Sequence, residues 1–263
     1  MSVVVPAWGD YAGEPLTEAL ASLRAQDVPA RVLVVDNASE PALAELDGAE
    51  VIRSHQRLTV GAARNLGLES VTTPYVLFWD ADDLMLPGTL RFLQDRIAAE
   101  PDAVLVAASI LEGDPPVPHR WPRPWTYPLT RWRRAFALVH CVWSLFPSTG
   151  SSIMRTADAK EAGFGDANSG EDWVLGVSLA FRGRVLMETR PGRLYRRQVG
   201  SLWETQRSAV QLVRHATAVR ERMRRDPKVP AWARLLLPLV ALFQVSAVRV
   251  VKPLVETVRA IRR

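Results

Sequence analysis

Short apolar runs rich in valine recur through the first part of the chain, and longer stretches with helical periodicity separate them. The runs lie at residues 3–5, 31–35, 50–52, 74–79 and 103–109. Near-continuous apolar runs of this length are typical of strands that are covered on both faces, as in parallel sheets. We therefore predict an α/β fold with a mostly parallel central sheet flanked by helices.

Two of the separating stretches carry apolar side chains at the spacing of an amphipathic helix. These side chains are Leu16, Ala19, Leu20 and Leu23 in the first stretch, and Leu90, Leu93 and Ile97 in the second. Further along, we expect a strand near residues 152–154, a helix over about 172–181 and a strand near 184–188. Residues 115–157 lack acidic side chains but are rich in arginine, proline and tryptophan, so we expect a long irregular insertion over the sheet there.

Charge divides the chain into two parts. Residues 1–206 hold 20 basic and 25 acidic side chains, whereas residues 207–263 hold 13 basic and 3 acidic ones. We therefore predict a main domain over residues 1–206 and a basic, amphipathic helical tail over residues 207–263. A tail of this charge is expected to meet an anionic surface, and we expect a membrane rather than nucleic acid.

Part of the tail is strongly apolar. Residues 235–248 are apolar apart from Gln244 and Ser246, and they lie between Arg234 and Arg249. This stretch is too short to span a bilayer, which takes about 20 residues. It fits a helix that lies in the membrane interface with its apolar face in the lipid. The alternative is a helix that is docked on the main domain.

The single cysteine, Cys141, excludes an internal disulfide framework and a cysteine-rich zinc site, which suits a reducing compartment. The chain enters an apolar strand at Val3 without the basic region and long apolar run of a signal peptide. We therefore expect a cytoplasmic protein that is held on the cytoplasmic face of a membrane by its tail.

The sequence VLFWDADDLM, residues 76–85, runs from four apolar residues into Asp80, Asp82 and Asp83. In open α/β sheets, ligands bind beyond the carboxyl ends of the strands, where these acids are expected. Mg²⁺ and Mn²⁺ prefer one or two carboxylates together with phosphate oxygens and water, so the Asp-x-Asp pattern indicates a metal-bound phosphate ester. The alternative is a turn whose acids cap a helix that begins near Pro87.

Three other stretches are expected at the same edge of the sheet. The first strand ends in PAWG (residues 6–9), which is not the GxGxxG of a dinucleotide fold. The second strand ends in DNAS (residues 36–39). The stretch GAARN (residues 61–65) combines small residues, which permit a close approach, with Arg64, which can reach a phosphate.

Together, in this order and spacing, these stretches resemble the family-2 glycosyltransferases of the GT-A fold. The family pattern of VIPTYN, DDGS, GxxxARNxG and DADD appears here as VVVPAWG, VVDNAS, GAARNLG and FWDADD. The resemblance continues in SGEDWVLGVSLAFRG (residues 169–183) and YRRQVGS (residues 195–201), and it covers about residues 2–203. It implies that residues 1–206 form a GT-A catalytic domain.

The resemblance also implies a reaction. A sugar would pass with inversion from a nucleotide-diphospho-sugar, above all a UDP-sugar, to a hydroxyl group of the acceptor, with Mn²⁺ or Mg²⁺ as cofactor. A tail on a membrane surface would suit a cell-envelope glycan or a lipid-linked acceptor.

Carried over by position, the resemblance assigns the donor site to matching residues. Pro6, Ala7 and Trp8 would line the nucleotide base, and Asp36 would hold the base or the ribose. Arg64 would approach the base or the diphosphate.

The acids after the buried strand would hold the metal ion. Asp82 is the implied direct ligand, Asp80 would share the site on the ribose side, and Asp83 is a third candidate acid. In the closing stretch, contacts to the donor phosphates are expected from Arg196, Arg197 and Ser201.

The implied catalytic base is Asp172, with Glu171 beside it. This base would take the proton of the acceptor hydroxyl as the hydroxyl oxygen attacks the anomeric carbon. The same four residues, Ser169 to Asp172, also match a helix capping box, which is the structural alternative.

Two departures from the family pattern concern the donor site. Trp8-Gly9 replaces Tyr-Asn but keeps an aromatic face for stacking. Gln198 stands where many relatives have histidine, so a third metal ligand would be altered here or replaced by water.

Two other functions remain open at this point. A phosphatase of the haloacid dehalogenase type also uses Asp-x-Asp after a strand, but after its first core strand and with Thr or Val where this chain has Leu84. A catalytically degenerate GT-A subunit that only binds or scaffolds is the non-enzymatic alternative.

Overall fold

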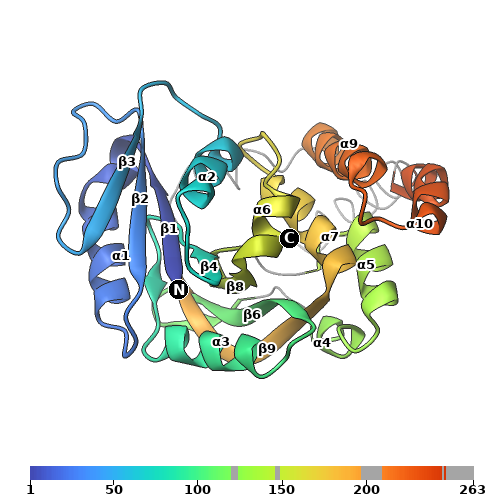
Figure 1. The fold of residues 1–263 in the computed structure, drawn as a ribbon, viewed down its shortest axis with the longest axis horizontal. Coiled ribbons are helices and arrows are strands. Elements are labelled where there is room, and N and C mark those ends of the chain that lie inside the picture. Colours follow the sequence, from blue (N-terminus) through green and yellow to red (C-terminus); the bar gives the residue numbers. More distant parts are fainter. Residues whose placement is uncertain (120–123, 146–148, 197–208, 245, 247–263) are drawn as a thin grey trace, which may run out of the picture.

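The computed structural model describes residues 1–119, 124–145, 149–196, 209–244 and 246. In this part of the chain a mixed sheet is built from strands in the order β3-β2-β1-β4-β8-β6-β9-β5, and β7 pairs with β6 (Figure 1). The strands are β1 (Ser2–Ala7), β2 (Arg31–Asn37), β3 (Ala49–Ser54), β4 (Tyr75–Phe78), β5 (Leu84–Met85), β6 (Ala103–Glu112), β7 (Val117–Pro118), β8 (Ser152–Arg155) and β9 (Arg184–Tyr195).

Most of these strands run in one direction. β1 pairs in parallel with β2 and β4, β2 with β3, and β6 with β9. β8 lies between β4 and β6 and is antiparallel to both, while β5 and β7 are antiparallel to β9 and β6. The predicted strands of the first half are therefore confirmed, because each valine-rich run forms one of them.

Helices cover both faces of the sheet. They are α1 (Glu14–Arg24), α2 (Val60–Glu69), α3 (Thr89–Ala98), α4 (Thr126–Leu129), α5 (Arg133–Val142), α6 (Thr156–Ala162), α7 (Glu171–Arg182), α9 (Ala209–Arg225) and α10 (Ala231–Leu235), with short 3-10 turns η1 (Gly9–Ala12) and η2 (Thr149–Ser151). β1 shows the division between the faces: Val3 and Val5 pack with α1 and α3, whereas Val4 packs with α2.

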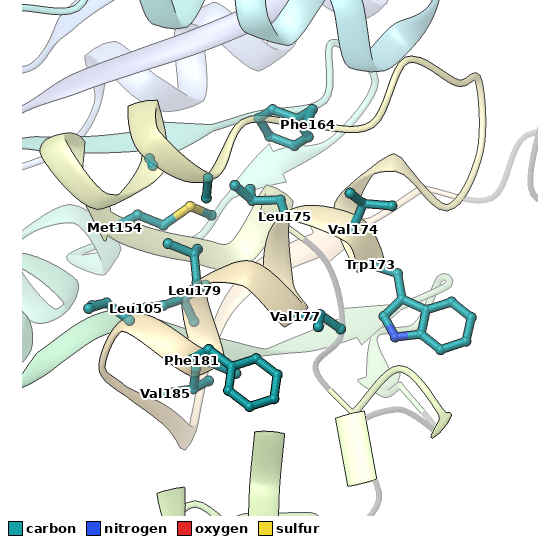
Figure 2. Close-up of a cluster of buried hydrophobic side chains, with 14 of the residues drawn as sticks. Leu105, Met154, Phe164, Trp173, Val174, Leu175, Val177, Leu179, Phe181 and Val185 are labelled. Atoms are coloured by element: carbon teal, nitrogen blue, oxygen red, sulfur yellow. The ribbon is translucent and has the colours of Figure 1, made fainter. Parts of the chain in front are cut away.

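The larger apolar core is built around α7. Figure 2 shows Trp173, Val177 and Phe181 of this helix among side chains from β6, β8 and β9. Because α7 is buried on nearly all sides, its position relative to the sheet is fixed by packing.

The predicted irregular insertion over residues 115–157 is wrong for much of its described part. α5 is a regular ten-residue helix with Phe136, Ala137, His140 and Cys141 buried on one face. This face packs against α7, so an amphipathic helix forms where the abundance of proline and arginine suggested a loop.

The described part of the tail is helical and docked on the main domain. Ala216, Val219 and Met223 of α9 are buried in the core around α7. The Arg182 guanidinium of α7 forms a buried ion pair of 2.5 Å with Asp226, directly after α9. Residues 247–263 lie outside the described residues, and the boundary predicted after residue 206 stays a prediction. None of the described helices is both long enough and apolar enough to cross a membrane.

Candidate active site

The carboxyl ends of β1, β2 and β4 meet at one edge of the sheet, which we call the strand-end rim. Ala7 of β1 is in register with Asp36 of β2, and the backbone N–H of Trp79 donates to the Val4 carbonyl of β1. The residues that follow these strands, Trp8 among them, are therefore neighbours in space, as the sequence predicts for parallel strands.

A pocket of about 210 Å³ opens at this rim. It is lined by Trp8, Asn37, Arg57, Leu58, Thr59, Val60 and Asn168. The Arg57 guanidinium lies 4.8 Å from the centre of the Trp8 ring, which is a cation–π contact. The Asn37 side chain bonds to both backbone groups of Leu58, at 2.8 and 3.0 Å. The wall of the pocket is thus an aromatic face with hydrogen-bonding groups beside it.

Pro6, Ala7 and Asp36 are not among the residues that line this pocket. Pro6 and Ala7 are buried within β1. The Asp36 carboxylate is fully buried and accepts from the backbone N–H of Ser39 and Leu43 and from Arg53. Burial opposes ionisation of Asp36, but these hydrogen bonds outweigh it and lower the pKa below its ordinary value. In this structure Asp36 holds the loop after β2, and its neighbour Asn37 reaches the pocket.

Buried arginines hold Asp80 at the centre of the rim. Arg64 of α2 donates through Nη2 to Asp80 Oδ1 at 2.7 Å, and Arg193 of β9 donates through Nη2 to Asp80 Oδ2 at 2.6 Å. Burial alone would raise the pKa of Asp80, but the two guanidinium groups hold it below its ordinary value. Arg64 also pairs with Glu171 at the start of α7, so one guanidinium joins the rim to α7.

The other two acids of the cluster differ from each other. Asp83 is fully buried, pairs with Arg193 and accepts from the backbone N–H of Arg196 at 2.8 Å. Asp82 forms no ion pair within the described part of the chain. Burial and the charge of Asp80 raise its pKa to about 6. Asp83 thus ties the loop to β9.

The start of α7 carries Glu171, which is buried, and Asp172, which is partly exposed. Burial raises the pKa of Glu171 to about 7 and also raises the pKa of Asp172, against the opposing charge of Arg64. The capping-box alternative is wrong. Gly170 is the N-cap residue, the helix has no side-chain cap, and the Ser169 hydroxyl bonds to His215 instead.

Sequence reasoning missed four residues that build this site. They are Arg57, Gly150, Arg193 and His215. A Cβ atom at Gly150 would collide with the Arg193 guanidinium, so glycine there lets Arg193 reach Asp80. No local pattern marks Arg193 or His215, because each meets its partner only through the tertiary fold.

Some expected site residues lie outside the described residues. These are Arg197, Gln198 and Ser201. Within the described ranges, no group of three or more histidine, cysteine, aspartate or glutamate side chains is arranged to hold a metal ion. A metal at the rim would therefore rely on the Asp-x-Asp carboxylates and on oxygens from its own ligands.

Comparison with known protein families identifies the chain. A model of the family described as glycosyl transferase family 2 matches residues 2–161, which is more than half of the sequence. The chain belongs to glycosyl transferase family 2. This membership confirms the predicted family, and it decides against the haloacid dehalogenase alternative.

Two curated family-2 relatives come from two strains of Mycobacterium tuberculosis. Each is named Pre-mycofactocin glycosyltransferase and is 32% identical to this chain over 182 residues. The match covers 65% of this chain but only 37% of each relative.

Solved structures of S. aureus TarS share the fold of this family-2 chain. TarS 1–349 in complex with UDP-GlcNAc has a TM-score of 0.66 at 16% identity, over 93% of this chain and 72% of TarS 1–349. Its complex with UDP has a TM-score of 0.63 at 16% identity, over 94% of this chain and 71% of that one. At this identity the likeness concerns the fold, and it confirms the predicted GT-A architecture.

Proposed function

We propose that this chain transfers a sugar from a nucleotide-diphospho-sugar, a UDP-sugar in the first place, to a hydroxyl group with inversion at the anomeric carbon. The observation that carries the proposal is the Arg64 guanidinium, which joins Asp80 on the strand-end rim to Glu171 at the start of α7. The proposed donor site and the proposed base therefore share one charged cluster, as a group transfer between two bound substrates requires.

Asp172 is the proposed general base. It takes the proton of the acceptor hydroxyl while the oxygen attacks the anomeric carbon from the face opposite the diphosphate. Burial raises the pKa of Asp172, which makes its carboxylate a stronger base for this transfer. Glu171 is engaged by Arg64 and holds this end of α7 against the rim.

The pocket at the rim is the proposed site of the nucleotide base. The Trp8 ring offers an aromatic face on which a pyrimidine stacks, and the Arg57 guanidinium beside it offers hydrogen-bond donors. The volume of about 210 Å³ suits the base rather than the whole nucleotide, so the diphosphate would extend toward Asp80 and Asp82.

Asp82 is the proposed metal ligand, with Asp80 beside it. The carboxylate of Asp82 forms no ion pair among the described residues, whereas both oxygens of Asp80 are held by arginines. A bound Mn²⁺ or Mg²⁺ would neutralise charge on the donor diphosphate. These ions favour sites with one or two carboxylates from the protein and further oxygens from phosphate groups. The residues present therefore fit the ion.

Calorimetric titration of UDP, with and without Mn²⁺, tests the donor site. The proteins are the wild type, Asp82→Asn and, as an exposed control, Asp47→Asn, whose side chain is 96% exposed. We expect Mn²⁺ to tighten UDP binding in the wild type and in the control but not in Asp82→Asn. Equal affinity of wild type and Asp82→Asn under both conditions would reject the metal role.

The acceptor is proposed to be a cell-envelope glycan or a lipid-linked molecule at a membrane surface. The support is a row of large apolar side chains on the outer face of the tail, which we call the apolar tail face. It consists of Trp232, Leu235, Leu236, Leu239, Leu242 and Phe243, all of them exposed. The opposite side of the same segment, with Ala233, Leu237 and Gln244, is buried against the protein.

The positive charge of the tail also supports a position at a membrane surface. Residues 207–263 hold 13 basic and 3 acidic side chains, and each basic residue near an anionic membrane contributes about 1 kcal/mol of binding. An apolar face flanked by positive charge is the pattern of an interfacial helix. The intact protein is thus proposed to lie on the membrane with the apolar tail face in the lipid boundary.

Flotation with vesicles tests this placement. We expect the intact chain to float with anionic vesicles at low salt and less with neutral ones. The double variant Leu239→Ser with Leu242→Ser should lose binding, whereas Val117→Ser, a half-exposed apolar residue elsewhere, should keep it. If the wild-type chain stays unbound with anionic vesicles at low salt, the tail is a packing element only.

A further inference from the structure

The loop between α6 and α7 leads directly to the proposed base. It ends in Ser169 and Gly170, which precede Glu171 and Asp172. Gly170 has a φ of +77°, a left-handed conformation that L side chains rarely adopt, and α7 lacks a side-chain cap. Packing fixes the body of α7, and contacts to this loop are a further restraint on its first turn, which carries Asp172.

Helix α2 holds one side of the loop. The Thr59 hydroxyl lies 2.5 Å from Asp166 Oδ1, and the backbone N–H of Val60 donates to Asn168 Oδ1 at 3.1 Å. The backbone N–H of Gly61 donates to the Ala167 carbonyl at 3.0 Å. The middle of the loop is thus attached to the helix that carries Arg64.

Helix α9 of the tail holds both ends of the same loop. Arg222 donates to the carbonyls of Ala162 and Phe164, the latter at 3.4 Å. The first half of α9 carries His215, whose Nε2 lies 3.1 Å from the Ser169 hydroxyl. The loop before Asp172 therefore lies between a helix of the donor site and a helix of the tail.

The His215 ring also fills the space beside Gly170. A Cβ atom built on Gly170 would lie 2.6 Å from Cγ and 2.8 Å from Cδ2 of the ring. The ring therefore occupies the place that a side chain at position 170 would take, and it is itself partly buried. The hydrogen bond to Ser169 and the contact with Gly170 thus restrain adjacent residues directly before the base.

From these contacts we propose that His215 is a positioning residue. It fixes the Ser169–Gly170 turn and, through this turn, the Asp172 carboxylate. The docked tail helix α9 is therefore part of the catalytic assembly. The inference rests on the proposed role of Asp172. A misplacement of about 1 Å at a reacting group can cost about a hundredfold in rate, so loss of the restraint should lower kcat. Donor binding should change little, because His215 is not among the residues that line the pocket at the rim.

The test compares His215→Ala, Ser169→Ala and His215→Gln in the full chain. Glu221→Ala, on the exposed side of the same helix, is the matched control. UDP-GlcNAc, the ligand of the TarS complex, serves as the trial donor, and release of UDP from it gives kcat and KM. Calorimetry gives the dissociation constant of UDP, and chemical denaturation checks that each variant is folded. Asp172→Asn is measured in parallel.

We expect His215→Ala and Ser169→Ala to lower kcat about tenfold or more while the dissociation constant of UDP stays within about twofold. Glutamine places a polar group near the position of Nε2, so His215→Gln should recover much of kcat. The double variant, His215→Ala with Ser169→Ala, should have a kcat no lower than that of the poorer single variant, because both substitutions remove the same hydrogen bond.

A wild-type kcat in His215→Ala, or in Ser169→Ala if the first variant fails to fold, would overturn the inference. An equal loss in Glu221→Ala would also overturn it, since the effect would then be general to α9. Wild-type turnover of Asp172→Asn is a different result, which refutes the proposed base and not the contact of His215 with the loop.

Discussion

The strand-end rim and the docked tail both concentrate charge, but they balance it differently. At the rim, the carboxylates of Asp80, Asp83 and Glu171 share the guanidinium groups of Arg64 and Arg193. Asp82 and Asp172 are left without an ion pair in the described structure. In the described part of the tail, the buried acid Asp226 pairs with Arg182.

The difference separates a functional arrangement from a structural one. A buried carboxylate that pairs with one guanidinium has its charge balanced within the protein and needs no ligand. An excess of buried carboxylate beside a pocket carries a cost that a cation or a transferred proton relieves, and perturbed acids of this kind are typical of active sites. Substitutions at the rim should therefore change binding or turnover, and those at the buried pair of the tail should change stability.

The largest stability effect is expected at the buried pair of the tail. Asp226→Ala leaves the Arg182 guanidinium buried without its main partner, which should cost about 3–5 kcal/mol of the free energy of unfolding. Glu161 lies 3.7 Å from the same guanidinium but is 57% exposed, so Glu161→Ala should cost at most about 1 kcal/mol. Urea denaturation measures both. Equal effects would mean that the tail is not docked through this pair.

The two faces of the segment after α10 give the next contrast. Leu237 is 1% exposed and Leu239 is 63% exposed. Leu237→Ala should cost about 2–5 kcal/mol of the free energy of unfolding, as buried leucines do. Leu239→Ala should stay within about 0.5 kcal/mol, as exposed sites do. If the unfolding free energies reversed this order, the assignment of the apolar tail face would be wrong.

A smaller effect, on binding, is expected at the rim. Trp8→Ala removes the aromatic face of the pocket, and stacking of one base on an aromatic ring is worth about 1–3 kcal/mol. The affinity for UDP should therefore fall by about tenfold in calorimetry, with unfolding unaffected. Trp125→Ala, at an exposed tryptophan away from the pocket, should bind UDP as the wild type does. Unchanged affinity of Trp8→Ala would place the base elsewhere.

The pH dependence of turnover tests whether Asp172, which has no ion pair in the described structure, has the raised pKa expected of a base. A base works as the carboxylate, and burial raises the pKa of Asp172 above the ordinary value of about 3.9. As pH falls through this raised pKa, kcat should decline by about tenfold per pH unit. Glu171→Gln removes the neighbouring acid, whose pKa is raised to about 7, and so removes the part of the profile that belongs to Glu171. A profile that stays flat down to about pH 4 would contradict the raised pKa.

Much of the rim could be predicted from the sequence for a simple physical reason. Parallel strands place their carboxyl ends at one edge, so polar residues directly after apolar runs must meet there. Trp8 and Asp80 were located in this way, and Arg64 followed from the small residues around it. Asp36 shows the limit of prediction from the sequence. The pattern predicts its position at the end of the strand, but not that its carboxylate binds the loop after β2.

The tail could be predicted only in outline. Its charge and apolar content are visible in the sequence, but they fit a docked helix and an interfacial helix equally well. The structure shows that one side of the segment, with Leu237, is buried, and that the other side, with Leu239, is exposed. The contact of His215 with Ser169 joins residues far apart in the chain, and no periodicity or motif signals it.

The central claim is that the rim binds the donor while the start of α7 supplies the base. Asp172→Asn tests it most directly, with UDP binding by calorimetry and UDP release from UDP-GlcNAc measured on the same preparation. A positioned base contributes about 10²- to 10⁴-fold, so turnover should fall at least about a hundredfold while the affinity for UDP stays that of the wild type. Near-normal turnover of Asp172→Asn would contradict the account.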